Sequence, residues 1–210
     1  MPFDVCGAMS QGYIGYHMQQ GLEKVLRARK NGKRVVTVVT QVVVDKDDPK
    51  FKAPSKPIGP FYTEDEARKL EAEKGYTMKE DAGRGWRRVV ASPMPVEIAE
   101  LDAVKCLMNG GFIAITVGGG GIPVIKDENG NYIGTAAVID KDLASERLAE
   151  DIDADALVIL TAVEQVCINF GKPEQKSLAT MTVEEARRYM AEAVSYTHLR
   201  AHETRSNIVC

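Results

Sequence analysis

The sequence lacks any apolar run long enough to cross a membrane. Its longest apolar stretches, Val35–Val44 and Ala156–Val163, are interrupted by Thr or Gln and fall well short of the roughly 18 residues that a transmembrane helix needs. The first residues, MPFDVC, also lack the charged region and the long apolar core of a signal peptide. These absences argue against a membrane protein and predict a cytoplasmic location.

Paired cysteines and an excess of one charge are lacking as well. The four cysteines, at positions 6, 106, 167 and 210, show no paired spacing, which argues against a disulfide framework and a CxxC metal site. Lys plus Arg total 27 against 30 Asp plus Glu, a formal net charge of -3. The chain therefore has neither a polybasic face nor an acidic tail. We expect no nucleic-acid partner, no membrane partner and no metal ligands from the protein.

The sequence has enough apolar residues for a core, and segments with a helical period alternate with apolar segments typical of buried strands. The chain has 210 residues, of which 44% are hydrophobic. Apolar residues three and four apart predict a helix over Gln11–Lys30, and the Val/Thr-rich stretch Arg34–Val44 predicts a strand buried on both faces. A helix followed by a buried strand indicates an α/β fold with a mainly parallel sheet.

The second half continues this pattern. Pro95 is the expected first residue of a helix that ends at Asn109-Gly110-Gly111, and a strand is predicted over Phe112–Val117. Asn129-Gly130, between apolar residues, predicts a hairpin turn.

Further along, Asp142 is the expected N-cap of a helix that carries Ala144, Leu148 and Ile152. A buried strand is predicted over Ala156–Leu160. Thr182 with Glu185 forms the pattern of a capping box, which predicts another helix directly after it.

The stretch from about residue 45 to 95 interrupts the α/β rhythm, and we call it the insert. It is rich in Asp, Lys, Glu, Gly and Pro, and it holds the only tryptophan, Trp86. We predict a surface-heavy subdomain that protrudes from the main domain. Arg84, Arg87 and Arg88 cluster around Trp86, which suits anion binding or simply the closing of the subdomain around its one tryptophan.

Four consecutive glycines, Gly118–Gly121, follow the predicted strand. Each glycine costs backbone entropy on folding, so the run indicates that another group approaches the backbone closely. Successive N–H groups without Cβ atoms can surround an anion such as a phosphoryl group, at the strand ends where α/β sheets bind ligands. A tight connection between strand and hairpin is the simpler alternative. The run matches neither a dinucleotide fingerprint nor a Walker loop.

Two lysines stand in unusual surroundings. Lys141 lies between Asp140 and Asp142 at a predicted helix start, where it could neutralise charge on a transferring phosphoryl group while an aspartate holds it in position. Lys56 lies between Pro54 and Pro57, which stiffen the backbone and present a fixed cation. A solvated charge cluster and an ordinary surface loop are the respective alternatives.

The last segment, residues 195–210 (SYTHLRAHETRSNIVC), has no helical or strand period. Its composition differs from the rest, and we interpret it as a non-native tail read through from a sequencing adapter, with a native disordered tail as the alternative. The domain prediction is thus a partial α/β domain over residues 1–194, containing the insert, and a tail over residues 195–210.

Taken together, the segments resemble the carbamate kinases, members of the amino-acid kinase family with a three-layer α/β fold. The similar segments follow the order of that family: residues 1–4 (MPFD), 9–16 (MSQGYIGY), 40–45 (TQVVVD), 56–61 (KPIGPF), 79–87 (KEDAGRGWR), 118–124 (GGGGIPV), 137–142 (AVIDKD), 155–160 (DALVIL) and 167–173 (CINFGKP). They cover about residues 1 to 193.

The resemblance implies phosphoryl transfer between ATP and carbamate, usually running toward ATP in arginine fermentation, with Mg²⁺ accompanying the nucleotide and a homodimeric enzyme. By this likeness Lys141 would contact the transferring phosphoryl group, Asp142 would organise the catalytic lysines, and Lys56 would reach the carbamoyl phosphate from the insert. Gly118, Gly119, Gly120 and Gly121 would border the substrate. Thr161, Ala162 and Val163 would lie by the nucleotide, although the family often has Gly where Ala162 stands.

The family pattern also contains a Gly-Gly-Asn phosphate loop, a Gly-Asn-Gly loop and a further C-terminal lysine that this sequence does not show. We therefore expect an internal fragment, incomplete at both ends, that is inactive or nearly so. Two alternatives stay open: another amino-acid kinase acting on a carboxylate or a nucleotide, and a non-catalytic nucleotide-binding remnant.

Overall fold

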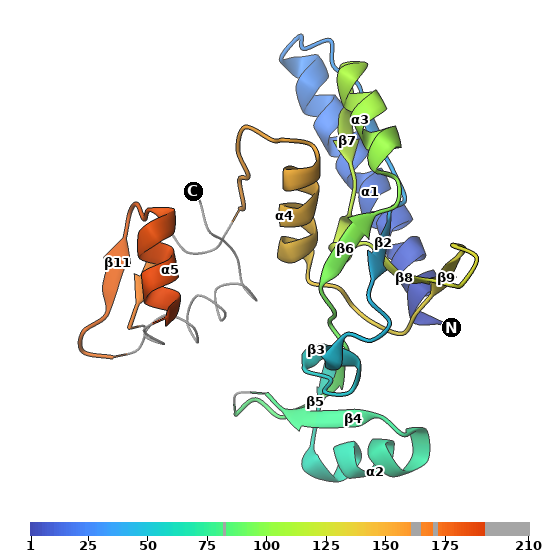
Figure 1. The fold of residues 1–210 in the computed structure, drawn as a ribbon, viewed down its shortest axis with the longest axis vertical. Coiled ribbons are helices and arrows are strands. Elements are labelled where there is room, and N and C mark those ends of the chain that lie inside the picture. Colours follow the sequence, from blue (N-terminus) through green and yellow to red (C-terminus); the bar gives the residue numbers. More distant parts are fainter. Residues whose placement is uncertain (82, 161–164, 170–171, 192–210) are drawn as a thin grey trace. The chain divides into compact units, whose positions relative to one another are not determined.

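A computed structural model describes residues 1–81, 83–160, 165–169 and 172–191. The chain divides into two units, residues 1–152 and 153–210, which are drawn in Figure 1. Within the described residues, no helix combines the length and the apolar character that a membrane span requires.

Helix α1, Phe3–Ala28, begins well before the predicted start at Gln11. Pro2 precedes it in extended conformation, and a fixed proline φ is well suited to a helix start. The helix ends at Ala28, with Arg29 as its C-cap and Lys30 following at φ 53°. Only Gln11 and Gly15 of α1 are buried, so most of its long surface is exposed within this unit.

The predicted strand Arg34–Val44 is two strands. β1, Val35–Thr37, pairs in parallel with β7, Ile113–Ile115. β2, Gln41–Val44, pairs in parallel with β8, Ile122–Lys126. The chain changes sheets at Thr40, whose backbone N–H donates to the Gln11 side chain instead of a strand. This contact, made by a residue 29 positions away, explains why the Val/Thr run alone predicted one continuous strand.

The prediction of a helix beginning at Pro95 is wrong. Residues 95–98 form β6, Pro95–Ile98, which pairs antiparallel with β2, and the helix α3 is Leu101–Asn109. Glu100 separates them, because its carboxylate accepts hydrogen bonds from the backbone N–H and side-chain amide of Gln41. The predicted helix end is confirmed, since Gly110 follows as the C-cap.

Antiparallel strands flank the parallel pair. The four-stranded sheet has the order β6-β2-β8-β9, and β9 is Tyr132–Gly134. The turn between β8 and β9 contains Gly130 with φ 81°, so the predicted hairpin is confirmed. The fold is α/β as expected, with parallel pairing at the centre and antiparallel pairing at the edges.

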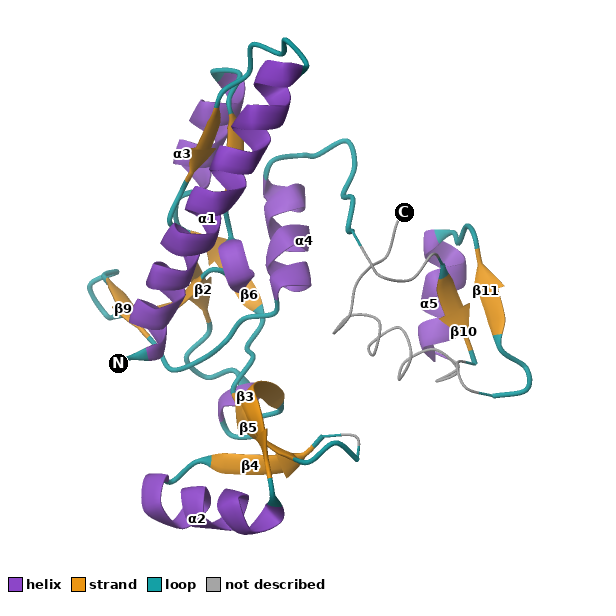
Figure 2. Ribbon diagram, turned by 180° about the vertical axis from the view of Figure 1, so that it is seen from behind, coloured by secondary structure: helices purple, strands orange, loops and turns teal. Residues whose placement is uncertain are grey.

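Helices cover both faces of this sheet. The largest core cluster joins Val42 and Val44 of β2 to Val104 of α3 and to Leu148 of α4, Lys141–Asp151. Val43, on the opposite face of β2, packs with Ile122, Val124 and Ala8 of α1. Figure 2, seen from behind, shows α1 lying across the strands. The alternation of side chains along one strand therefore creates the helix–sheet–helix layering.

The insert has its own sheet. Strands β3, Lys56–Tyr62, β5, Trp86–Val90, and β4, Thr77–Glu80, pair antiparallel in the order β3-β5-β4. The helix α2, Glu64–Lys74, connects β3 to β4, and a short 3₁₀ helix, Pro49–Phe51, precedes β3. Its surface-heavy character agrees with the prediction, since α2 buries only Ala67.

The second unit contains a hairpin and a helix. β10, Val166–Ile168, pairs antiparallel with β11, Lys176–Leu178, and α5 is Val183–Ala191. The predicted capping box is confirmed, because the Thr182 N–H donates to Glu185 Oε2 and the Glu185 N–H donates to Thr182 Oγ1.

The predicted strand Ala156–Leu160 is absent from the described strands. Val158 and Leu160 are 70% and 91% exposed, and none of the described strands pairs with this segment. A parallel strand exists only with a neighbour that takes its N–H and C=O groups, so the apolar run by itself does not make one. Residues 195–210 lie outside the described residues, and their separation from the kinase-like domain stays a prediction.

Candidate active site

The four glycines form a tight turn against the start of α4. Gly118–Gly120 is a 3₁₀ turn, and Gly119, Gly120 and Gly121 all have positive φ. A Cβ atom on Gly120 would lie 2.3 Å from the Ile139 carbonyl oxygen and 3.3 Å from the Lys141 nitrogen. The close approach predicted from the glycines is therefore an approach of two backbones. It brings the glycine turn and Lys141 together from positions some twenty residues apart in the sequence.

The neighbouring glycines fix the turn to two other elements. A Cβ atom on Gly121 would lie 2.1 Å from Val42 Cγ2, and one on Gly118 would lie 3.2 Å from Gln11 Cγ. A groove of about 280 Å³ lies beside the turn and is lined by α1, by strand ends and by Gly118, Gly119 and Gly121. The turn is thus held by β2, α1 and the start of α4 at once.

A buried polar network supports the turn from α1. Gln11 is 5% exposed and Thr40 is fully buried. The Gln11 amide donates to the Thr40 carbonyl at 3.0 Å and accepts from the Thr40 N–H at 2.7 Å. Thr40 Oγ1 lies 2.7 Å from Thr116 Oγ1 and accepts from the Val117 N–H, directly before the glycines. These hydrogen bonds connect α1 to the backbone that enters the turn.

Gln11 and Thr40 were not among the residues predicted for the site. The available signal was weak: Gln11 is a polar residue at the start of a predicted amphipathic helix, and Thr40 interrupts a run of valines. Buried polar side chains require partners, but the sequence does not say that these two are partners of each other.

Asp140 is the N-cap of helix α4, so the predicted N-cap, Asp142, is wrong by two residues. Asp140 has extended backbone, and its carboxylate accepts a 2.9 Å hydrogen bond from the Asp142 N–H. Asp142 instead lies in the first turn. The N-cap is the residue directly before the first helical residue. Its side chain can accept a hydrogen bond from the free backbone N–H groups of the first turn.

Lys56 of the insert reaches this helix start. Its Nζ lies 2.5 Å from Asp140 Oδ2, and the two side chains are 24% and 14% exposed. Burial acts to raise the pKa of Asp140, but the hydrogen bond and the charge of Lys56, with the N–H groups of Asp142 and Leu143, outweigh it and lower that pKa. Asp140 is therefore an ionised carboxylate that holds Lys56 at the N-terminus of α4.

Lys141 and Asp142 complete the charge arrangement. Lys141 Nζ lies 3.4 Å from Asp142 Oδ2, and the Lys141 side chain is 57% exposed while that of Asp142 is 16% exposed. Two lysines and two aspartates thus meet at one helix N-terminus beside the glycine turn. Helix N-termini favour anions, and mobile lysine cations can stabilise developing phosphoryl charge. The arrangement suits transfer of an anionic group.

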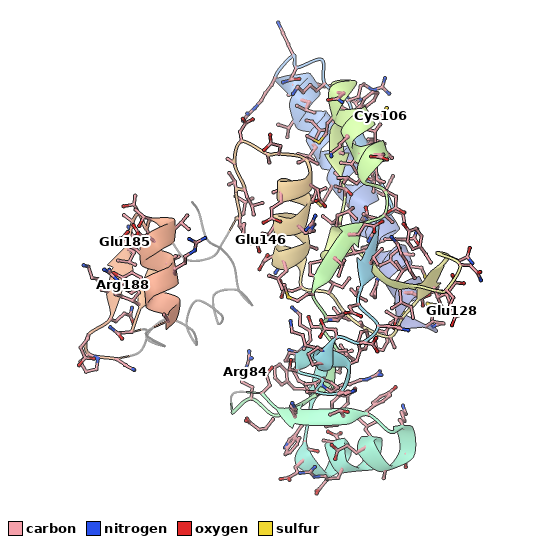
Figure 3. All side chains as sticks on the ribbon, in the orientation of Figure 1. Arg84, Cys106, Glu128, Glu146, Glu185 and Arg188 are labelled. Carbon is pink, nitrogen blue, oxygen red and sulfur yellow. The ribbon has the colours of Figure 1, made fainter. Side chains whose placement is uncertain are left out.

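Of the three arginines around Trp86, Arg84 and Arg87 contact groups of the insert, and Arg88 contacts both Tyr76 of the insert and Phe3 of α1. Arg84, labelled in Figure 3, and Arg87 both pair with Asp81, while Arg68 stacks over Trp86 at 4.4 Å. Of the two predicted uses for this cluster, these contacts favour closure of the subdomain. The three residues predicted beside the nucleotide, Thr161, Ala162 and Val163, lie outside the described residues.

Comparison with known proteins identifies the family of the chain. Residues 22–204 match the amino acid kinase family. The chain is 60% identical over 191 residues to "Carbamate kinase" of Clostridium perfringens, covering 91% of this chain and 60% of that protein. It is 57% identical over 193 residues to "Carbamate kinase-like protein YqeA" of Escherichia coli, covering 91% and 61%.

Solved structures give the same result. The structure titled "Carbamate kinase from Giardia lamblia bound to AMP-PNP" has a TM-score of 0.81 at 44% identity, covering 92% of this chain and 61% of that one. The same enzyme "bound to citric acid" has a TM-score of 0.84 at 41% identity, covering 97% and 66%. The chain spans about 60% of the length of the curated relatives. With a glycine turn against a lysine-bearing helix start, and with the family match across most of its length, the chain belongs to the amino acid kinase family.

Proposed function

We propose that this chain carries the phosphoryl-transfer site of a carbamate kinase, which moves a phosphoryl group between ATP and carbamate. The observation that carries the proposal is the meeting of Lys56, Asp140 and Lys141 at the start of α4, directly against the glycine turn. Relatives named carbamate kinase, 50–60% identical over 191 residues, support carbamate as the acceptor. The proposed net direction is ATP formation from ADP and carbamoyl phosphate, in arginine breakdown through the arginine deiminase pathway.

The reaction needs position and charge more than covalent help from the protein. In the ATP-forming direction a terminal oxygen of ADP attacks the phosphorus of carbamoyl phosphate, the bond from phosphorus to the carbamate oxygen breaks, and carbamate leaves with that electron pair. No proton has to move. Lys141 and Lys56 offset the charge on the transferring oxygens, and Asp142 holds Lys141 in place. The glycine turn admits the substrate close to the backbone.

Asp140 has two tasks in this scheme. It caps α4 through the Asp142 N–H, and it keeps Lys56 at the site before substrate arrives. Since the pKa of Asp140 is lowered, the carboxylate stays charged at neutral pH and Lys56 always has a partner. A substrate phosphoryl group would compete with Asp140 for Lys56.

Thr161, Ala162 and Val163 are the proposed neighbours of the nucleotide. Magnesium would enter with the nucleotide as part of the substrate, because phosphate oxygens and water are the ligands that it prefers. In the described part of the chain, no three His, Cys, Asp or Glu side chains converge as a metal site. Homodimeric assembly and a cytoplasmic location belong to the same proposal and rest on the family likeness.

The first test measures ATP formation from MgADP and carbamoyl phosphate, together with calorimetric binding of each substrate. The unchanged 210-residue chain is expected to have a low rate, and Lys141→Ala is expected to lower that rate by a further factor of about 10² to 10³. Lys56→Met is expected to weaken carbamoyl phosphate binding while leaving MgADP binding unchanged. Lys126→Met is the matched control, because Lys126 forms a 2.5 Å ion pair with Glu97 on β6, outside the α4 start.

A chain that binds MgADP and does not bind carbamoyl phosphate would contradict the proposal and favour a non-catalytic nucleotide-binding protein. A chain that uses another carboxylate or a nucleotide monophosphate better than carbamate would place it with a different amino acid kinase.

A further inference from the structure

Lys56 and Arg88 project from the same face of the insert's sheet. In the β3–β5 pair, Lys56 is opposite Val90 and Ile58 is opposite Arg88. Residues directly opposite each other, and residues two apart along a strand, share one face of a sheet. Arg88 lies two positions before Val90, which is opposite Lys56, so Lys56 and Arg88 project from the same face.

Arg88 is held between two aromatic rings. Its guanidinium carbon lies 3.7 Å from the ring centre of Tyr76, in the insert, and 4.8 Å from the ring centre of Phe3. All three side chains are half-buried. Stacking of guanidinium on ring faces is a contact that Arg makes and Lys makes less well.

The other arginines of the insert have carboxylate partners. Arg84 and Arg87 pair with Asp81, and Arg68 pairs with Glu64 and Glu71. Among the described residues, no carboxylate forms an ion pair with Arg88, and of the arginines that stack on rings only Arg88 joins the insert to α1. Its contacts are thus different in kind from those of its neighbours.

The two side chains end on two different elements of the α/β body. Lys56 contacts Asp140 at the N-terminus of α4, and Arg88 contacts Phe3, the first residue of α1. Helix α1 is itself attached beside the glycine turn through Gln11 and Thr40. One ion pair and one aromatic stack therefore join side chains of the insert to the body, in addition to the hydrogen bond from the Val138 N–H to the Ala91 carbonyl and the packing of Phe51 against the core.

We propose that Arg88 is a positioning residue, whose stack between Tyr76 and Phe3 holds the insert against α1 while Lys56 exchanges Asp140 for a phosphoryl oxygen of the substrate. This inference rests on the function proposed above. During that exchange the Lys56–Asp140 ion pair is broken, so it cannot hold the insert at the moment of transfer. The stack contains neither Lys56 nor Asp140, so breaking their ion pair leaves it in place.

Hydrogen–deuterium exchange on the 210-residue chain tests the attachment. Arg88→Ala is expected to speed exchange in the first turn of α1, where the Cys6 N–H donates to the Pro2 carbonyl, by about fivefold. The turn inside the insert, where the Asp81 N–H donates to the Gly85 carbonyl, should exchange as before. Arg88→Lys should restore only part of the protection.

Arg68→Ala is the matched control, since Arg68 also stacks on an aromatic ring but only within the insert. It should leave exchange in α1 unchanged. Equal effects of Arg68→Ala and Arg88→Ala on α1, or faster exchange throughout the insert in Arg88→Ala, would mean that Arg88 only stabilises the insert and would overturn the inference.

Carbamoyl phosphate binding tests the positioning role. Arg88→Ala and Phe3→Leu are each expected to weaken it about fivefold with MgADP binding unchanged. Unchanged carbamoyl phosphate affinity in both variants, when the parent chain binds it, would overturn the positioning role alone. Failure of the parent chain to bind carbamoyl phosphate would overturn the proposed function and the positioning role with it, while the exchange data would still decide whether the stack attaches the insert.

Discussion

The α/β body and the insert use different interactions to place their parts of the site. In the body, the glycine turn is held by backbone contacts with Ile139 and by the fully buried side chain of Val42. In the insert, buried apolar side chains are few, and arginines stack on rings or pair with carboxylates. Close packing allows almost no movement. Ion pairs and aromatic stacks can break and form again when the chain moves. The body therefore fixes the glycine turn, and the insert can carry a lysine that changes partners.

The largest effect is expected at Gly120, which tests the rigidity of the body. Gly120→Ala should lower the free energy of unfolding by about 3 kcal/mol or more, because the positive φ is strained for Ala and the new Cβ would meet the Ile139 carbonyl at 2.3 Å. Urea unfolding measures the change.

Gly119→Ala separates the two causes. Gly119 also has positive φ, at 66°, but a Cβ there meets nothing within 4 Å. This variant should lose only about 1 kcal/mol. Equal losses in the two variants would mean that the backbone contact with α4 contributes nothing to the rigidity of the turn.

The next largest effect concerns the buried polar network behind the turn. Gln11→Leu should destabilise the chain by about 2 to 4 kcal/mol, because the N–H and the carbonyl of Thr40 both lose their Gln11 partner inside the core. Gln19→Leu is the control, since Gln19 accepts from Thr37 at a half-buried site, and it should cost less in the same urea titration.

The Lys56–Asp140 ion pair between the insert and the body predicts that the stability of the chain depends on pH. The pKa of Asp140 is lowered in the folded chain, so its contribution to stability is present above the unfolded-state value of 3.8 and is lost as the pH falls through the folded value. Lys56→Met removes the partner and leaves the burial, which raises the pKa of Asp140. The variant should be less stable than the unchanged chain by about 1 to 3 kcal/mol at pH 7. This difference in the free energy of unfolding should become smaller below about pH 4.

Lys126→Met again serves as the comparison. The Lys126–Glu97 pair has the same 2.5 Å separation, but its side chains are 42% and 43% exposed. Solvent screens such a pair, so its removal should leave the urea midpoint nearly unchanged between pH 4 and 7. If Lys126→Met lowers stability as much as Lys56→Met does, burial does not determine the strength of the Lys56–Asp140 ion pair.

The smallest effect is expected inside the insert. Thr63 caps α2 in a capping box with Glu66, and Thr63→Ala should cost about 1 kcal/mol, seen as faster amide exchange in α2 alone. Thr182→Ala, in the equivalent box of α5, should have a similar local effect. Loss of exchange protection at the glycine turn in Thr63→Ala would contradict the independence of the two regions.

Local patterns predicted the parts of the site whose cause is local. The hairpin at Asn129-Gly130 and the capping box at Thr182 follow from neighbouring residues. The glycine run predicted close approach of an anion, and the sequence did not indicate that the Ile139 carbonyl would lie against Gly120. The start of α4 was misplaced at Asp142, because the sequence offers two aspartates and does not decide which one faces the free N–H groups. Pro95 was assigned to a helix because a proline suits a first turn as well as an edge strand.

The sequence by itself determined the α/β class, the insert and the family resemblance, since periodicity, glycine positions and motif order are written along the chain. Tertiary structure alone decided that Lys56 meets Asp140, 84 positions away, that Thr40 bonds to Gln11, and that Arg88 stacks on Phe3. These are contacts between side chains brought together by packing, and their strength depends on burial. Burial at any one residue is set by elements distant in the sequence, which no local pattern contains.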